Sequence, residues 1–113
     1  MKRVLIGMMS VIVLAAFAGV ASAQDTAKGA KVYADQKCSL CHSIAGKGNA
    51  KGSLDGIGSK LSTQEIHDWI VDPVGMTAKA KAPRKPPMPA KYKALPKEDL
   101  DALVAYLASL KSK

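Results

Sequence analysis

The sequence is poor in the side chains that usually build a core or a disulfide framework. Only 4% of its 113 residues are aromatic, with one Phe and one Trp, and it has two cysteines. Two cysteines cannot form the four- or six-cysteine framework of a small disulfide-stapled domain. The length fits one small domain, which excludes a large enzyme and a multidomain receptor. Acidic residues are also few, since 9 Asp and Glu against 17 Lys and Arg give a net charge of +8.

The N-terminus has the three parts of a secretory signal peptide. Lys2 and Arg3 form a charged start, residues 4–20 are almost entirely apolar, and Ala21-Ser22-Ala23 places small residues at the cleavage positions. We predict cleavage before Gln24. The alternative is an uncleaved membrane anchor, but the apolar run lies at the short limit of the roughly 17 to 25 residues that span a bilayer. The protein is therefore predicted to be periplasmic or otherwise exported, with no stable membrane insertion after cleavage.

Removal of residues 1–23 leaves a mature domain, residues 24–113, that is short of bulky apolar groups. It has 90 residues and a net charge of +6. Small domains usually need a staple, a metal or a cofactor to compensate for a small core. The sequence therefore predicts that something large and apolar completes this domain, because its aromatic residues are few: Tyr33, Trp69, Tyr92 and Tyr106.

The residues from Cys38 to His42 have the pattern Cys-x-x-Cys-His, which can attach the large apolar group that the domain lacks. This run is the attachment signature of c-type haem. The spacing of Cys38 and Cys41 lets both thiols reach the two vinyl groups of one porphyrin. The adjacent His42 then offers an imidazole nitrogen as the proximal iron ligand. One covalent haem c would add the large apolar plate that the side chains do not provide.

Three other interpretations of the same residues are weaker. A thioredoxin-like redox pair would need a strand before it and a βαβ pattern, and neither is visible. A structural zinc site needs four ligands, and His67 is the only further candidate, in a separate helical segment. A disulfide between Cys38 and Cys41 would close a very small loop and stabilise little. The sequence favours haem.

The first and last helical segments of the mature domain are readable from their patterns. The first is predicted from about Asp25 to Cys38, with Asp25 or Thr26 as its N-cap, so the haem motif lies at its end. The last is predicted to begin near Pro96, which suits the start of a helix. Its apolar residues recur every three or four positions: Leu100, Leu103, Val104, Leu107 and Leu110.

A middle helix has the clearest start in the sequence. Ser62 and Glu65 form a capping box, in which each side chain can accept a hydrogen bond from the other residue's backbone amide. Pro73 is predicted to stop this helix. His67 falls off its apolar face and is interpreted as a solvated histidine, whereas that face consists of Ile66, Trp69 and Ile70.

The two segments between the helices have loop composition. Residues 46–58 contain five glycines and are interpreted as a flexible connector. Residues 74–93 show no helical or strand period and are predicted to be extended and stiff, because four prolines fall within them. Since no stretch shows the alternation of a strand, the mature domain is predicted to be all-α.

With these motifs in place, the chain resembles a class I c-type cytochrome, the small monohaem kind, over essentially the whole mature domain. The resemblance depends on the motif at Cys38 to His42, on a Met within the Pro-rich run of residues 85–89, and on the closing helix. It implies a cytochrome c fold of about three to four helices around one haem. It also implies that the first and last helices cross, with Gly29 and Tyr33 meeting Leu103 and Tyr106.

The resemblance further implies a methionine thioether as the sixth iron ligand. Met88 is the preferred candidate, because its proline neighbours fix the backbone around it, and Met76 is the fallback. An open or His-ligated iron is the remaining alternative. The family often has Gly-Pro-x-Leu after the motif, with the proline carbonyl orienting the haem His. Here Ser53 stands where proline is expected, so the acceptor for His42 stays open.

His and Met ligation together predict an electron carrier and not an enzyme, because both axial positions of the iron are filled. The alternatives are a ligand-binding or catalytic haem protein with an open sixth position, and a membrane-anchored or permanently docked cytochrome subunit. Trp69 and Tyr92 are candidate hydrogen-bond donors to the haem propionates, with a core or rim role as the alternative.

Charge is distributed unevenly in the same part of the chain. Residues 73–96 carry six basic groups and no acidic one. A basic rim around the haem edge would steer the protein toward acidic redox partners, although ordinary solvation of a loop is the alternative. We expect a monomer that does not bind nucleic acid. The basic groups concerned are Lys79, Lys81, Arg84, Lys85, Lys91 and Lys93.

Overall fold

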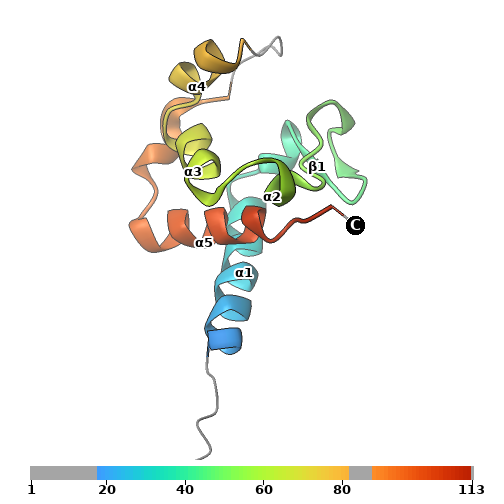
Figure 1. Ribbon diagram of the computed structural model, residues 1–113, viewed down its shortest axis with the longest axis vertical. Helices are drawn as coiled ribbons and strands as arrows, with labels where there is room; N and C mark the ends of the chain where they lie inside the picture. The colour runs from blue at the N-terminus through green and yellow to red at the C-terminus, as the bar shows by residue number, and fades with distance from the viewer. Residues whose placement is uncertain (1–17, 82–87, 113) are drawn as a thin grey trace, which may run out of the picture.

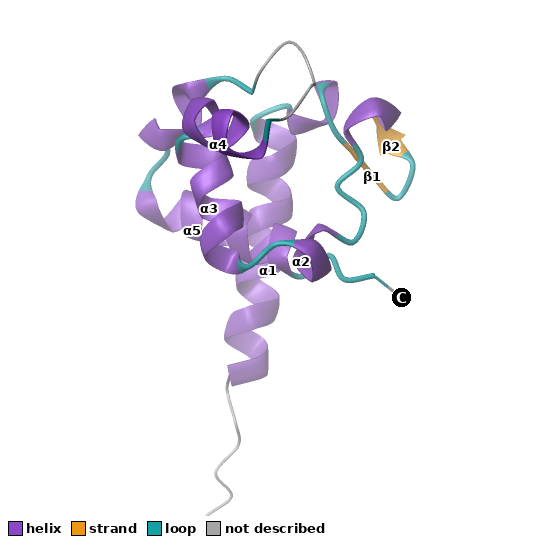
Figure 2. Cartoon of the chain, turned by 45° about the horizontal axis from the view of Figure 1, so that its top comes forward, coloured by secondary structure: helices purple, strands orange, loops and turns teal. Residues whose placement is uncertain are grey.

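A computed structural model describes residues 18–81 and 88–112 of the chain. Within these residues the fold is helical, which confirms the all-α prediction, and it adds one small hairpin (Figures 1 and 2). The α-helices are α1 (Ala18–Asp35), α2 (Ile57–Lys60), α3 (Thr63–Val71), α4 (Pro73–Ala80) and α5 (Lys97–Ala108). Three 3-10 turns, η1 (Cys38–Leu40), η2 (Ala50–Gly52) and η3 (Ala90–Ala94), and two paired strands, β1 (Ser43–Ile44) and β2 (Lys47–Gly48), complete the described elements.

Helices α1 and α5 cross closely, as the resemblance implied (Figure 1). Gly29 is buried at the crossing, where a Cβ would collide with the backbone carbonyl of Ala102 and the Cβ of Tyr106. One turn further along α1, Tyr33 packs edge-on against Tyr106 with ring centroids 6.0 Å apart. The absence of a side chain at Gly29 therefore lets the two backbones approach, and the tyrosine pair closes the contact.

The core is one cluster in which α5 packs against α1 and α3. The periodic residues of the last helix face inward as predicted, and the stripe of α3 meets them from the other side. Burial of apolar surface in this cluster stabilises the packing of the helices, by roughly 25 cal/mol per Å². Its buried members are Val32, Ile66, Ile70, Tyr92, Leu100, Leu103, Val104 and Leu107.

The predicted capping box of α3 is confirmed. The Ser62 hydroxyl accepts from the Glu65 amide at 3.1 Å, and the Glu65 carboxylate accepts from the Ser62 amide at 3.0 Å. The helix ends at Val71, before Pro73. The cap thus fixes the start of the helix that carries Trp69 toward the interior.

The predicted bounds of the first helix are wrong at both ends. In the full chain, Asp25 and Thr26 lie inside helix α1, which spans Ala18–Asp35, so neither is an N-cap there. An alanine-rich run precedes Asp25, and alanine favours the helix without a capping side chain. The helix ends at Asp35 because Lys37 adopts a left-handed conformation, with φ 56°. A separate 3-10 turn therefore carries the haem motif.

Both predicted loops contain regular structure. Residues 73–80 form α4, because Pro73 suits the first helical position and the Asp72 carboxylate accepts from the Gly75 amide at 3.1 Å. In the glycine-rich segment, strands β1 and β2 pair antiparallel around a turn at Ala45 and Gly46, which both have positive φ. Strands of two residues are too short to show an alternating pattern, so no strand was predicted here. Residues 82–87, including Arg84 and Lys85, lie outside the described residues.

Candidate functional site

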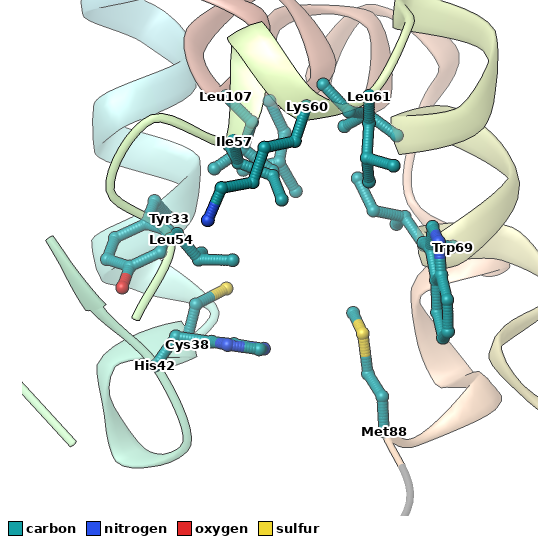
Figure 3. Close-up of a pocket in the computed structure, with 13 residues that line it drawn as sticks. Tyr33, Cys38, His42, Leu54, Ile57, Lys60, Leu61, Trp69, Met88 and Leu107 are labelled. Carbon is teal, nitrogen blue, oxygen red and sulfur yellow. The ribbon is translucent and has the colours of Figure 1, made fainter. Parts of the chain in front are cut away.

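An apolar cavity of about 330 Å³ opens among α2, α3, α5 and the motif turn (Figure 3). Its walls come from segments far apart in the sequence, so the tertiary fold creates it. Few of the lining groups are polar, which suits a flat apolar ligand. The lining residues are Tyr33, Cys38, His42, Leu54, Ile57, Lys60, Leu61, Ile66, Trp69, Ile70, Met88, Leu103 and Leu107.

The motif turn brings Cys38 and His42 to one wall of this cavity. The carbonyl of Cys38 accepts from the amides of Cys41 at 3.2 Å and His42 at 3.0 Å, which winds the motif into a tight turn. Cys38 is partly buried, and Cys41 is exposed. Burial raises the pKa of the Cys38 thiol, with a further increase from Cys41. The turn therefore presents Cys38 to the cavity, whereas Cys41 is exposed and is not among the lining residues.

The carbonyl of Gly52 fixes the orientation of the His42 ring, which answers the question that the sequence left open. His42 Nδ1 lies 2.9 Å from the Gly52 oxygen. Because a carbonyl oxygen only accepts, Nδ1 is the nitrogen that carries the proton, and Nε2 is left with its lone pair. Counted back from Leu54 in the Gly-Pro-x-Leu pattern, Gly52 holds the proline position. The expectation that Ser53 holds it is wrong.

The small hairpin supports the motif turn from outside the cavity. The Asn49 amide donates to the carbonyls of His42 at 3.0 Å and Ser39 at 3.2 Å. At Gly48, with φ 111°, a Cβ would collide with the His42 carbonyl. The glycine-rich segment is therefore not a simple connector. Its glycines let the backbone press against the turn that holds His42.

Met88 stands across the cavity from His42, with its sulfur directed inward (Figure 3). It is half-buried and follows directly after the undescribed residues 82–87. Met76, the fallback, lies in α4 and does not line the cavity. The structure thus brings together an imidazole and one thioether at facing walls. Of the two methionines in the predicted mature domain, only Met88 has that position.

Two polar side chains of the cavity, those of Lys60 and Tyr33, were not predicted to line it. Lys60 extends its ammonium group to the cavity from α2 (Figure 3). Tyr33 Oη is buried without a hydrogen-bond partner within the described residues, and burial raises the pKa of this phenol. Lys60 gave no signal in the sequence because it is one of many lysines. Tyr33 was expected only at the helix crossing.

Several candidates of the sequence analysis have different surroundings. Trp69 lines the cavity, but Tyr92 is buried in the core and is not among the lining residues. His67 lies outside the cavity on α3, partly exposed, with Nδ1 3.3 Å from the Asp68 carboxylate, as expected of a solvated histidine. Among the residues that the structure describes, no group of three His, Cys, Asp or Glu side chains gathers as a metal site. The zinc interpretation thus gains no support.

The groups at the cavity fit a haem c. An imidazole whose Nδ1 is held by Gly52 and a thioether face each other across apolar walls, and two thiols lie on one turn beside the imidazole. Imidazole and thioether are the axial ligands of electron-carrying cytochromes, and the thiols would form the thioether attachments. Tyr33, Leu54 and the α5 leucines would enclose the ring and exclude water.

The fold and this cavity define a small helical haem protein. The family model for cytochrome c matches residues 26–111, and the chain belongs to the cytochrome c family. Membership implies a covalently bound haem c. The first and last helices of the match are those that cross at Gly29.

A curated protein similar to this chain is cytochrome c oxidase subunit 2 of Alkalihalophilus pseudofirmus. The two are 29% identical over 93 residues, covering 74% of this chain and 25% of that protein. The chain thus spans about a quarter of the length of this relative. No solved structure matches the chain. In the described part of the chain, none of the helices combines the length and apolar character that crossing a membrane requires.

Proposed function

We propose that this protein is an exported electron carrier with one haem c, attached through Cys38 and Cys41 and ligated by His42 and Met88. The observation that carries the proposal is the pair of facing groups at the apolar cavity. His42 has Nδ1 held by the Gly52 carbonyl at 2.9 Å, so Nε2 is the ring nitrogen that would bind iron. Met88 presents its sulfur from the facing wall (Figure 3).

Filled axial positions favour electron transfer over catalysis. Bound haem c supplies an iron that alternates between the ferrous and ferric states, and methionine ligation raises its reduction potential. The chain's own groups hold that iron in one geometry, because the motif turn and the hairpin are joined by backbone hydrogen bonds. A site that rearranges little suits rapid exchange of one electron. It also leaves no position for a substrate, which favours a non-enzymatic role.

Lys60 and Trp69 are the residues we propose for holding the haem propionates. Both line the cavity, and both carry a hydrogen-bond donor. A cationic ammonium beside an otherwise apolar cavity is stabilised when a carboxylate lies next to it. Tyr92 is buried in the core and is a weaker candidate than the sequence indicated.

The partners are proposed to present acidic docking surfaces. Lys79, Lys81, Lys91 and Lys93 are exposed on the segments that flank Met88. Their charge would speed association with an acidic partner, with rates that fall as salt rises. Redox encounters are typically small and transient, which suits a monomeric shuttle. Export makes nucleic acid an unsuitable partner.

Export itself is proposed from the signal-like N-terminus. Cleavage before Gln24 would remove the first six residues of α1 and keep Gly29 and Tyr33 at the helix crossing. The intact mass of the protein purified from its native host tests this. A chain that starts at Gln24 supports export with cleavage, and a chain that starts at Met1 in the membrane fraction supports the anchored alternative.

A permanently docked subunit is the second candidate function, and the similarity to an oxidase subunit favours it. The haem in this cavity would then receive electrons and pass them to a neighbouring terminal oxidase. Gel filtration of the gently solubilised native membrane separates the two candidates. A shuttle elutes alone at the size of the 90-residue domain, whereas a subunit elutes with the oxidase.

The test of the central proposal is the optical spectrum of the reduced holoprotein with and without carbon monoxide. A closed His–Met iron gives the same spectrum in both conditions at neutral pH. A rapid shift to a CO-bound spectrum would show an open or weakly held sixth position. The ligand-binding alternative would then replace the carrier.

A further inference from the structure

The C-terminal segment, Leu110–Ser112, is bonded to α2 at several points. The Gly58 amide donates to the Leu110 carbonyl at 2.8 Å, and the Lys111 ammonium donates to the Gly58 carbonyl at 2.7 Å. The Ser112 amide donates to the Ser59 hydroxyl at 2.8 Å. More than fifty residues separate the partners in sequence. The segment therefore ties the end of the chain to a short helix near its middle.

Two glycines allow this close approach. At Gly58, a Cβ would collide with the carbonyl of Ala108 at the end of α5. At Gly56, which has φ 70°, a Cβ would collide with the Ser112 hydroxyl. Helix α2 has only four residues, too few to be stable by itself. The position of α2 therefore depends on the segments to which it is hydrogen-bonded.

The same short helix is a wall of the cavity. Ile57 and Lys60 belong to α2, and Leu61 follows it directly, and all three line the cavity (Figure 3). The segment before this helix is bonded to strand β1, which directly follows the haem motif, because the Leu54 amide donates to the Ser43 carbonyl at 2.8 Å. The wall is thus held before its start by strand β1 and at Gly58 and Ser59 by the C-terminal segment.

We propose that Leu110–Ser112 is a latch that holds the α2 wall against the haem and limits the access of water to it. The residues of the latch do not line the cavity, so they are positioning residues that act through Ile57, Lys60 and Leu61. Burial of the haem is one of the terms that set its reduction potential. Release of the latch would therefore lower the potential, because water stabilises the more highly charged ferric state. The part concerning potential depends on the function proposed above, whereas the wall position does not.

The first test is hydrogen exchange on the full holoprotein and on a variant that ends at Leu110. The variant loses the bonds of Lys111 and Ser112, and a variant that ends at Ser112 is the matched control. We expect exchange of the Gly58, Ser59 and Leu61 amides to rise about tenfold, equivalent to about 1.4 kcal/mol of local opening. Amides at the α1–α5 crossing should not change. Unchanged exchange in α2, or an equal rise throughout the protein, would overturn the latch.

Point variants keep the test decisive if the truncated chain does not fold. Lys111→Met removes the donor to the Gly58 carbonyl, Lys111→Arg restores a donor, and Ser59→Ala removes the acceptor for Ser112. We expect Lys111→Met and Ser59→Ala to speed exchange in α2, with Lys111→Arg close to the natural protein. Wild-type exchange in both Lys111→Met and Ser59→Ala would contradict the proposal.

The second test is the midpoint potential of the same variants, measured while the optical spectrum reports the iron ligands. We expect a lower potential with an unchanged His–Met spectrum, since only water access changes. An unchanged potential in a variant whose α2 exchanges faster would remove the haem part of the proposal. If the natural protein binds CO readily, the proposed ligation fails, but the exchange experiment still decides whether the latch exists.

Discussion

His42 Nδ1 lies 2.9 Å from the carbonyl oxygen of Gly52, ten residues further along the chain. This one hydrogen bond determines which imidazole nitrogen carries the proton and how the ring is oriented. Gly52 is itself held, because its amide donates to the Asn49 carbonyl at 3.1 Å, and Asn49 is bonded to the motif turn. A proline at position 52 would lose that bond, so glycine here preserves the loop that carries the acceptor.

Replacement of Met88 should leave the sixth coordination position of the iron open. In Met88→Ala the thioether that faces His42 is lost, so we expect the holoprotein to bind carbon monoxide readily and its reduction potential to fall. Optical spectra and redox titration measure both effects. Met76→Leu is the matched control, because Met76 does not line the cavity. Equal CO binding by the two variants would contradict ligation by Met88.

Addition of one methyl group at the helix crossing should destabilise the fold. In Gly29→Ala the new Cβ meets the Ala102 carbonyl and the Tyr106 side chain, and overpacking of this kind costs about 1–3 kcal/mol. Urea unfolding followed by circular dichroism measures the loss. Lys31→Ala changes an exposed residue of the same helix and should leave the free energy of unfolding almost unchanged. If both variants unfold at the same urea concentration, the crossing is not as close as described.

Loss of the α3 cap should weaken the protein without changing the haem ligands. Ser62→Ala removes the acceptor for the Glu65 amide at 3.1 Å, and loss of such a cap costs about 0.5–2 kcal/mol. The optical spectrum should stay that of the natural protein, because Ser62 does not line the cavity. Thermal unfolding measures the change. Thr63→Ala, next to the cap, is the control, and an equal loss in both would contradict a specific role for the box.

Neutralisation of lysines near Met88 should slow association with an acidic redox partner. The variant Lys91→Gln/Lys93→Gln removes two exposed charges from η3. Stopped-flow electron transfer at several salt concentrations should give slower rates at low salt and a weaker salt dependence. Lys28→Gln is the control, since Lys28 pairs with Glu98 and Asp99 at the α1–α5 contact. Rates that ignore salt in the natural protein would refute electrostatic steering.

The chemistry of this protein was readable because it is encoded locally. The motif at Cys38 to His42 is five consecutive residues, and the Ser62–Glu65 cap spans one helical turn, so both could be recognised without knowledge of the fold. The stripe of α5 was equally clear, because its apolar spacing matches the helical period. Helix α4 was not predicted, because the four prolines in residues 74–93 indicated an extended segment, whereas Pro73 begins a helix.

The sequence by itself determined the haem motif, the helical class, the cap of α3 and the preference for Met88. Only the tertiary structure decided which carbonyl orients His42, that Lys60 reaches the cavity, and that the C-terminal segment ties down α2. The physical reason is the distance in sequence between the residues that interact. Caps, motifs and helical stripes depend on residues a few positions apart, whereas the cavity depends on contacts between segments that meet only when α1 and α5 cross.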